Sequence, residues 1–73
     1  MSFEEARFVF DDPHEVEFFD RDHSDDEPRF ARIGMSDKRL LFVIFTLREA
    51  RIRIIHTRKA NKVLEKMYAE EFD

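Results

Sequence analysis

The spacing of hydrophobic residues changes twice along this chain, and these changes predict the order of its elements. Within residues 2–10 the apolar side chains recur every three or four positions, as on one side of a helix. Ser2, followed by Glu5 three residues later, forms a capping-box pattern that is typical of a helix start. We expect this helix to end near Pro13, because the residue before a proline disfavours helical backbone.

Four strand-like segments follow, and they share a high content of β-branched and aromatic residues. They are EVEFFD (15–20), RFARIGMS (29–36), RLLFVIFTL (39–47) and ARIRIIHTR (50–58). The third contains the longest apolar run of the chain, LLFVIF (40–45), which is typical of a central strand with both faces covered. Short connections between successive segments favour an antiparallel sheet.

The fourth segment alternates between apolar and basic residues. Ile52 and Ile54 fall on one face, whereas Arg51 and Arg53 fall on the other. Strict alternation also puts His56 on the isoleucine face, where we expect a core-facing, hydrogen-bonded histidine. Arg58 would share that face, so we expect the strand to have ended before it.

The spacing returns to that of a helix from Asn61 onward. Val63, Leu64, Met67 and Tyr68 fall on one helical stripe, which predicts a closing helix packed on the sheet. The element order is therefore α-β-β-β-β-α. We predict a small α+β fold over residues 1–73, a single domain with a four-stranded antiparallel sheet and one helix before and one after it.

Charge is divided along the chain in a way that bears on function. Residues 1–28 carry eleven acidic and two basic side chains, and residues 29–66 carry eleven basic and three acidic ones, within a net charge of −4. The basic part predicts a surface for a polyanion. The alternative is that the two parts neutralise each other across one fold, and the sequence leaves both interpretations open.

Composition removes several classes of protein from consideration. The chain has 73 residues and no cysteine, which excludes disulfides and thiolate metal sites. Nine phenylalanines argue against disorder, although 41% of the residues are charged. No apolar run is long enough to cross a bilayer, and no signal peptide opens the chain. We therefore expect a cytoplasmic protein that does not bind membranes.

The stretch DRDHSDDEPRF (20–30) is the most acidic part of the sequence, and we expect a loop there. Asp20, Asp22 and Ser24 fall at the first, third and fifth positions of a calcium-binding loop. Asp25 then stands where that loop requires glycine, and Ala31 stands where it requires a glutamate. Zinc would need further convergent ligands, which the sequence does not provide. We therefore predict no metal site and no cofactor.

Two groups of residues are candidates for chemistry. His23, in the acidic loop, is either a solvent-exposed histidine or a proton-transfer group. Arg51 and Arg53 share a strand face, and Arg58, Lys59 and Lys62 continue the positive charge into the next turn and helix. Guanidinium groups suit phosphate oxygens, so this segment predicts either a phosphate-binding surface or a salt-bridged face.

Three segments resemble, in the same order, the BrnT family of bacterial type II toxins. They are SFEEARFVFDDP, FFDRDHSDDEPRFARIGMS, and RIRIIHTRKA followed by the helix with Tyr68. The most distinctive part is D-x-D-H-S-x-x-E-x-R, formed by Asp20, Asp22, His23, Ser24, Glu27 and Arg29. Compared with that family, the chain lacks the usual N-terminal segment that supplies the first strand.

This resemblance implies a RelE-like fold and a metal-independent ribonuclease that halts translation. It also implies a BrnA-like antitoxin with a ribbon-helix-helix domain. Operator DNA would be contacted only through this antitoxin. We expect a homodimer, because the lost strand would leave a sheet edge unpaired. The alternative is a truncated, non-catalytic module that dimerises or binds the antitoxin without cleaving RNA.

The resemblance also suggests roles for individual residues. Arg53 and Arg58 would stabilise the phosphate and the charge that develops on it during cleavage. His23 would act as the general acid or base, oriented by Glu27 and its neighbour Arg29. The RNA backbone would be bound by basic side chains on three elements: Arg51, Lys59, Arg29 and Lys62.

Overall fold

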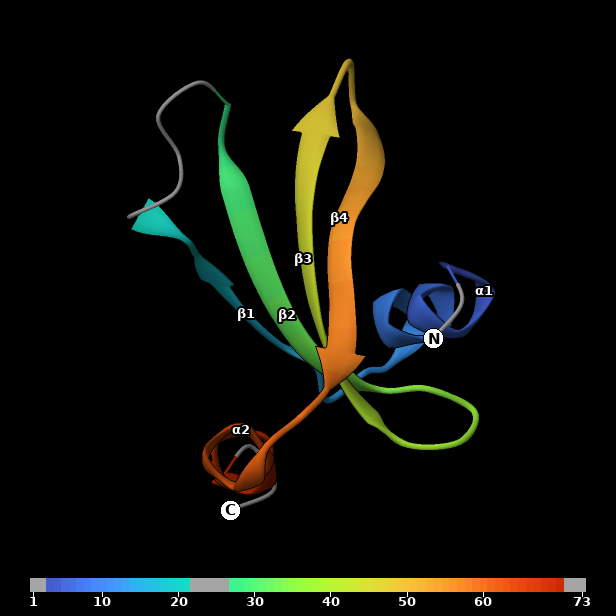
Figure 1. Ribbon diagram of the computed structural model, residues 1–73, viewed down its shortest axis with the longest axis vertical. Coiled ribbons are helices and arrows are strands. Elements are labelled where there is room, and N and C mark those ends of the chain that lie inside the picture. Colours follow the sequence, from blue (N-terminus) through green and yellow to red (C-terminus); the bar gives the residue numbers. More distant parts are fainter. Residues whose placement is uncertain (1–2, 22–26, 71–73) are drawn as a thin grey trace.

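The computed structural model describes residues 3–21 and 27–70, and the predicted α+β order is present in it (Figure 1). The elements are α1 (Phe3–Arg7), the 3-10 helix η1 (Phe8–Asp11), β1 (Val16–Phe19), β2 (Arg29–Met35), β3 (Leu40–Arg48), β4 (Arg51–Lys59) and α2 (Lys62–Glu70). All neighbouring strands are antiparallel, in the order β1-β2-β3-β4. The prediction of a four-stranded antiparallel sheet with one helical segment at each end is confirmed.

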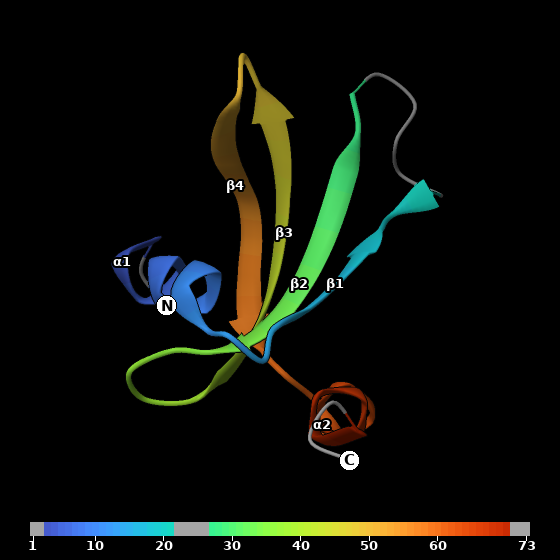
Figure 2. The same cartoon turned by 180° about the vertical axis from the view of Figure 1, so that it is seen from behind.

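The two helices lie on opposite faces of the sheet. Side chains of β3 alternate between these faces, so the central strand is covered on both sides as predicted. We call the side that packs against Ala6 and Val9 the α1 face, and the side that packs against Leu64 and Tyr68 the α2 face. Figures 1 and 2 show α1 beside β4, whereas α2 lies at the end where the strands converge.

Only half of the predicted stripe on α2 is buried. Leu64 and Tyr68, one helical turn apart, pack on the sheet and are each 8% exposed. Val63 and Met67 remain exposed, because the helix meets the sheet along a narrow line at one end. The helix starts directly after β4, where the side chain of Asn61 accepts a hydrogen bond from the backbone N–H of Leu64 (2.9 Å).

Asp12 joins elements from both faces. Its carboxylate accepts hydrogen bonds from the backbone N–H of His14 (2.9 Å), the backbone N–H of Met35 (2.7 Å) and the hydroxyl of Tyr68 (2.6 Å). Burial raises the pKa of Asp12, but these donors outweigh it and hold the pKa below its usual value. Burial and the hydrogen bond to Asp12 raise the pKa of Tyr68 to about 12.

The packing of the α1 face also depends on the close approach of Val9 to the backbone of β2. A Cβ atom at Gly34 of β2 would lie 2.6 Å from Cγ1 of Val9, the buried residue of η1. Such a distance is well inside van der Waals contact, so the only glycine of the chain is what lets η1 pack on β2. No helix in the described part of the chain is long and apolar enough to cross a membrane.

The substitution Gly34→Ala tests this approach. We expect it to lower the free energy of unfolding by about 1–3 kcal/mol, because the added methyl group pushes η1 away from the sheet. Urea denaturation of Gly34→Ala, Val9→Ala and the double variant measures this. Removal of the Val9 methyl groups makes room for the new Cβ, so the double variant should lose less than the two single losses together. Additive losses would contradict the packing described above.

The Asp12–Tyr68 hydrogen bond gives a second test, which uses pH. Because the pKa of Tyr68 is raised in the folded state, the stabilisation is complete below the ordinary tyrosine pKa of about 10 and is lost as the pH approaches about 12. We expect Tyr68→Phe to lose about 1–2 kcal/mol at pH 7. In urea denaturation, the difference between the wild type and Tyr68→Phe should shrink between pH 10 and 12. A constant difference would count against the hydrogen bond.

Candidate nucleic-acid interface

One extra residue in β4 decides which side chains meet on the α2 face. His56 opposes Ile44, yet Ile54 opposes the next residue of β3, Phe45, so Ile55 has no partner and forms a β-bulge. In a strand a one-residue shift exchanges the two faces. Ile52 and Ile54 therefore face α1 before the bulge, whereas His56 and Arg58 share the α2 face with Arg53 after it.

The packing agrees with this exchange of faces. Arg58 opposes Phe42, and its guanidinium carbon lies 4.9 Å from the centroid of the Phe42 ring, which belongs to the α2-face core. Thr57, between Arg58 and His56, opposes Val43 of the α1-face core. Arginine stacked on an aromatic ring keeps its fork of donors available to a ligand.

Two expectations from strict alternation are therefore wrong. His56 does not face the core with the isoleucines but is exposed on the opposite face. The strand also does not end before Arg58, because β4 continues to Lys59. The only sequence sign of the bulge is the pair Ile54–Ile55, where two adjacent apolar residues break the alternation.

Basic side chains line up across the strands at one end of this face. Arg29 of β2 opposes Thr46 of β3, which opposes Arg53 of β4, so the three share a face in one cross-strand row. Strand spacing puts the Cα atoms of Arg29 and Arg53 about 10 Å apart. Arg51 lies on the same face, where it opposes Arg48 beside the turn.

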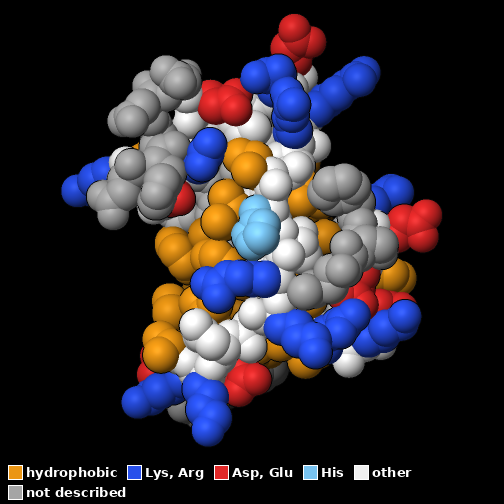
Figure 3. All heavy atoms as spheres, viewed as in Figure 1, with side chains coloured by type: hydrophobic (Ala, Val, Ile, Leu, Met, Phe, Trp, Pro, Cys, Tyr) orange, Lys and Arg blue, Asp and Glu red, His pale blue; other side chains and the backbone are white. Residues whose placement is uncertain are grey.

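Apolar side chains occupy the rows between the arginines and α2. The row through His56 contains Ile44, Ala31 and Phe18, one from each other strand. Figure 3 shows a histidine near the middle of one side of the molecule, with hydrophobic side chains on one flank and lysine or arginine side chains above and below it. The α2 face thus has positive side chains on either side of an apolar row.

The acidic part of the chain neutralises other arginines. Ion pairs join Arg32 to Glu15 (3.3 Å) and Glu17 (2.7 Å), and Arg39 to Glu5 (3.0 Å). The hydrogen bond from Arg39 lowers the pKa of Glu5 although burial opposes the shift. Within residues 3–21 and 27–70, no ion pair involves the basic residues of β4. The basic residues of β4 therefore form no salt-bridged face with the acidic residues of these two ranges.

The remaining predicted site residues are distributed over several places. Glu27 accepts a hydrogen bond from Arg48 at 3.1 Å. His23, with the rest of residues 22–26, lies outside the described residues. Lys59 opposes Leu41 and so lies on the α1 face, away from the arginines, and Lys62 is exposed at the start of α2. Of the predicted site residues that the structure describes, Arg29, Arg51, Arg53 and Arg58 share the α2 face.

The turn between β3 and β4 carries strain. Its two loop residues, Glu49 and Ala50, have φ of 53° and 65°, the left-handed backbone that hairpin turns usually assign to asparagine and glycine. Non-glycine residues adopt this backbone at a cost in free energy. The two-residue loop fixes the register of Arg48 with Arg51, and with it the face on which Arg51 and Arg53 lie.

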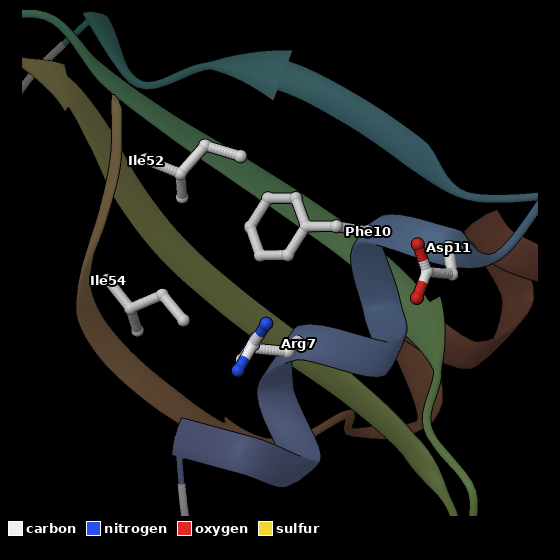
Figure 4. A pocket seen from close by; sticks show the side chains of 5 residues that line it. All are labelled: Arg7, Phe10, Asp11, Ile52 and Ile54. Atoms are coloured by element: carbon white, nitrogen blue, oxygen red, sulfur yellow. The ribbon is translucent and has the colours of Figure 1, made fainter. Parts of the chain in front are cut away.

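The opposite face has a hollow of a different character. Phe10, Ile52 and Ile54 line a space of about 460 Å³ together with Arg7 and Asp11. Figure 4 shows Phe10 and Arg7 extending from the helical segment toward the two isoleucines of β4. Ile52 is 50% exposed, so the apolar surface is incompletely covered. Among the described residues, no group of three His, Cys, Asp or Glu side chains converges to hold a metal.

A family model of known proteins matches most of the chain. A family model described as "Ribonuclease toxin, BrnT, of type II toxin-antitoxin system" matches residues 1–63 of the 73. No curated protein matches the chain. The matched range includes the whole sheet, the bulge and every basic residue of β4. The chain therefore belongs to the BrnT family of ribonuclease toxins of type II toxin–antitoxin systems.

Proposed function

We propose that this protein is a metal-independent, RelE-like endoribonuclease that inhibits translation and cleaves RNA on the α2 face. The supporting observation is that Arg53 and Arg58 are exposed on one face and have no acidic partner within the described part of the chain. Guanidinium groups without carboxylate partners are suited to bind phosphate oxygens. The chain's family supplies the reaction class.

The proposed reaction uses the ribose itself as the nucleophile. The 2′-hydroxyl attacks the adjacent phosphate in line with the leaving 5′-oxygen, and the phosphate passes through a crowded, doubly charged transition state. The Cα atoms of Arg53 and Arg58 lie about 13 Å apart by strand geometry, and one other side chain of β4 lies between them on this face. Their side chains can approach a phosphate from both sides and stabilise this charge.

The other basic residues extend this site into a track for the RNA backbone. Arg29 lies in the same row as Arg53, and Arg51 lies beyond it toward the turn. Because such contacts depend on the phosphates, they bind RNA of many sequences and weaken as salt rises. Lys59 and Lys62 lie outside this face and would contact only RNA that passes around the end of β4.

Charge-neutral variants test the arginine assignment. We expect Arg53→Gln and Arg58→Gln each to lower the rate of single-stranded RNA cleavage by about 100-fold, because each removes a donor to the transition state. Arg7→Gln, on the α1 face, is the matched control and should cleave as fast as the wild type. Gel analysis of end-labelled RNA in the presence of EDTA measures the rates. Unchanged cleavage by both variants would contradict the assignment.

We further propose that a BrnA-like ribbon-helix-helix antitoxin neutralises the protein and anchors in the hollow of the α1 face, with operator DNA contacted only through the antitoxin. Membership of a toxin–antitoxin family implies an antitoxin. Ile52 and Leu47 oppose each other on this face and are 50% and 45% exposed. Half-exposed apolar side chains beside a hollow are suited to protein binding. An antitoxin anchored there needs only to pass the edge of β4 to reach the arginines.

Adjacent residues of β4 separate the two functions. We expect Ile52→Glu to weaken antitoxin binding at least tenfold, since a carboxylate would have to be buried in the hollow, and to leave RNA cleavage unchanged. Arg53→Gln, one residue away on the other face, should lose cleavage as above. Calorimetric titration with the antitoxin and the RNA assay measure both. Equal antitoxin affinity for Ile52→Glu and the wild type would move the docking site elsewhere.

The second candidate function is a non-catalytic module that dimerises or binds the antitoxin without cleaving RNA. In the described part of the chain β4 is an edge strand of nine residues, and open edges can pair with a second copy. Expression in bacteria distinguishes the candidates. Growth arrest that the antitoxin relieves supports the toxin. Unaffected growth, with a melting temperature that rises with protein concentration, supports the dimeric module.

A further inference from the structure

We infer that His56 is the proton-transfer group for RNA cleavage on the α2 face, an inference that rests on the proposed ribonuclease function. The β-bulge at Ile55 brings its imidazole to the face that carries Arg53 and Arg58. Along β4 it is the next side chain on that face after Arg53 and the last before Arg58. A phosphate held between the two guanidinium groups therefore lies over His56.

The imidazole is available for such a role. His56 is exposed, and no hydrogen bond or ion pair joins its side chain to another residue in the described part of the chain. A histidine that supported the fold would be expected to have a partner for at least one ring nitrogen. Imidazole exchanges protons close to neutral pH, which suits it to general acid–base catalysis.

The surroundings of His56 also suit a nucleotide. On this face its neighbours are Arg53 and Arg58 on β4, with Ile44, Ala31 and Phe18 across the sheet. The charged groups at either side would hold the phosphate, and the partly exposed Ile44 and the exposed Phe18 offer apolar contacts for the ribose and base. Phe18, 37% exposed and about 14 Å away by strand spacing, has a ring face on which a neighbouring base can stack.

The reaction balances with His56 as the base. Neutral imidazole takes the proton of the 2′-hydroxyl as the bond from O2′ to phosphorus forms. The bond from phosphorus to the 5′-oxygen breaks, and that oxygen takes a proton from water. The imidazolium then gives its proton to the resulting hydroxide, which regenerates neutral imidazole and water. The products are a 2′,3′-cyclic phosphate on one fragment and a 5′-hydroxyl on the other.

Removal and replacement of the imidazole test this role. We expect His56→Ala to lower the cleavage rate by about 10²- to 10⁴-fold without changing RNA affinity. Imidazole added to the solution should restore part of the rate, because the vacated space lies on an open face. A structural role would not respond to free imidazole. His14→Ala is the matched control and should behave as the wild type, and circular dichroism verifies that each variant is folded.

The same assays contain the outcomes that would overturn the inference. Wild-type cleavage by His56→Ala would overturn it, as would a loss of rate that imidazole does not restore. His23→Ala provides the comparison with the histidine of the acidic loop: rescue by imidazole of that variant alone would assign proton transfer to His23. If the wild type leaves RNA intact, the proposed function fails, and the role of His56 fails with it. Failure of the inference alone leaves wild-type cleavage and the arginine effects in place.

Discussion

The carboxylate of Asp12 is the interaction on which the arrangement of the elements depends. Asp12 follows η1 on one face of the sheet. Its carboxylate accepts a hydrogen bond from the backbone N–H of Met35 at the end of β2 and another from the hydroxyl of Tyr68 of α2 on the other face. The two helical segments pack in separate core clusters, and this residue links them. A chain of 73 residues buries little apolar surface, and each such link is a large part of its stability.

The position of α2 in turn decides how much of the sheet stays open. Asn61 caps the helix directly after β4, and Leu64 and Tyr68 cover only the end of the face near Phe42. Farther along this face Ile44 packs at the margin of the same cluster, and Thr46 is fully buried, with its hydroxyl donating a hydrogen bond to the carbonyl of Pro28. The α2 helix, held through the Tyr68 hydroxyl and two buried side chains, therefore provides a core at one end of the face and does not extend over the arginines at the other.

The sequence was sufficient to predict the order, type and approximate limits of the elements. Helical spacing, proline at residue 13 and the apolar run of β3 are local signals, and the elements they predict agree with the structure. The faces of β4 were predicted only up to Ile54, because a bulge depends on pairing with β3 and has no reliable local signal. The link from Asp12 to Tyr68 spans 56 residues and follows from tertiary packing alone.

The distribution of ion pairs bears most directly on function. The charge division along the chain left two interpretations, and mutual neutralisation applies to only some of the arginines. Glutamates of the acidic part neutralise Arg32, Arg39 and Arg48, which are structural because they join strands, a helix and a turn. The arginines of β4 have no such partner in residues 3–21 and 27–70.

An arginine already paired with a carboxylate would have to exchange that partner for a phosphate, which reduces the gain on binding. The division between paired and unpaired arginines follows from register: Glu17 of β1 faces Arg32 on the α1 face, and the bulge turns His56 and Arg58 to the other. The single bulged residue of β4 therefore puts His56 and Arg58 on the face opposite the ion pairs of Arg32.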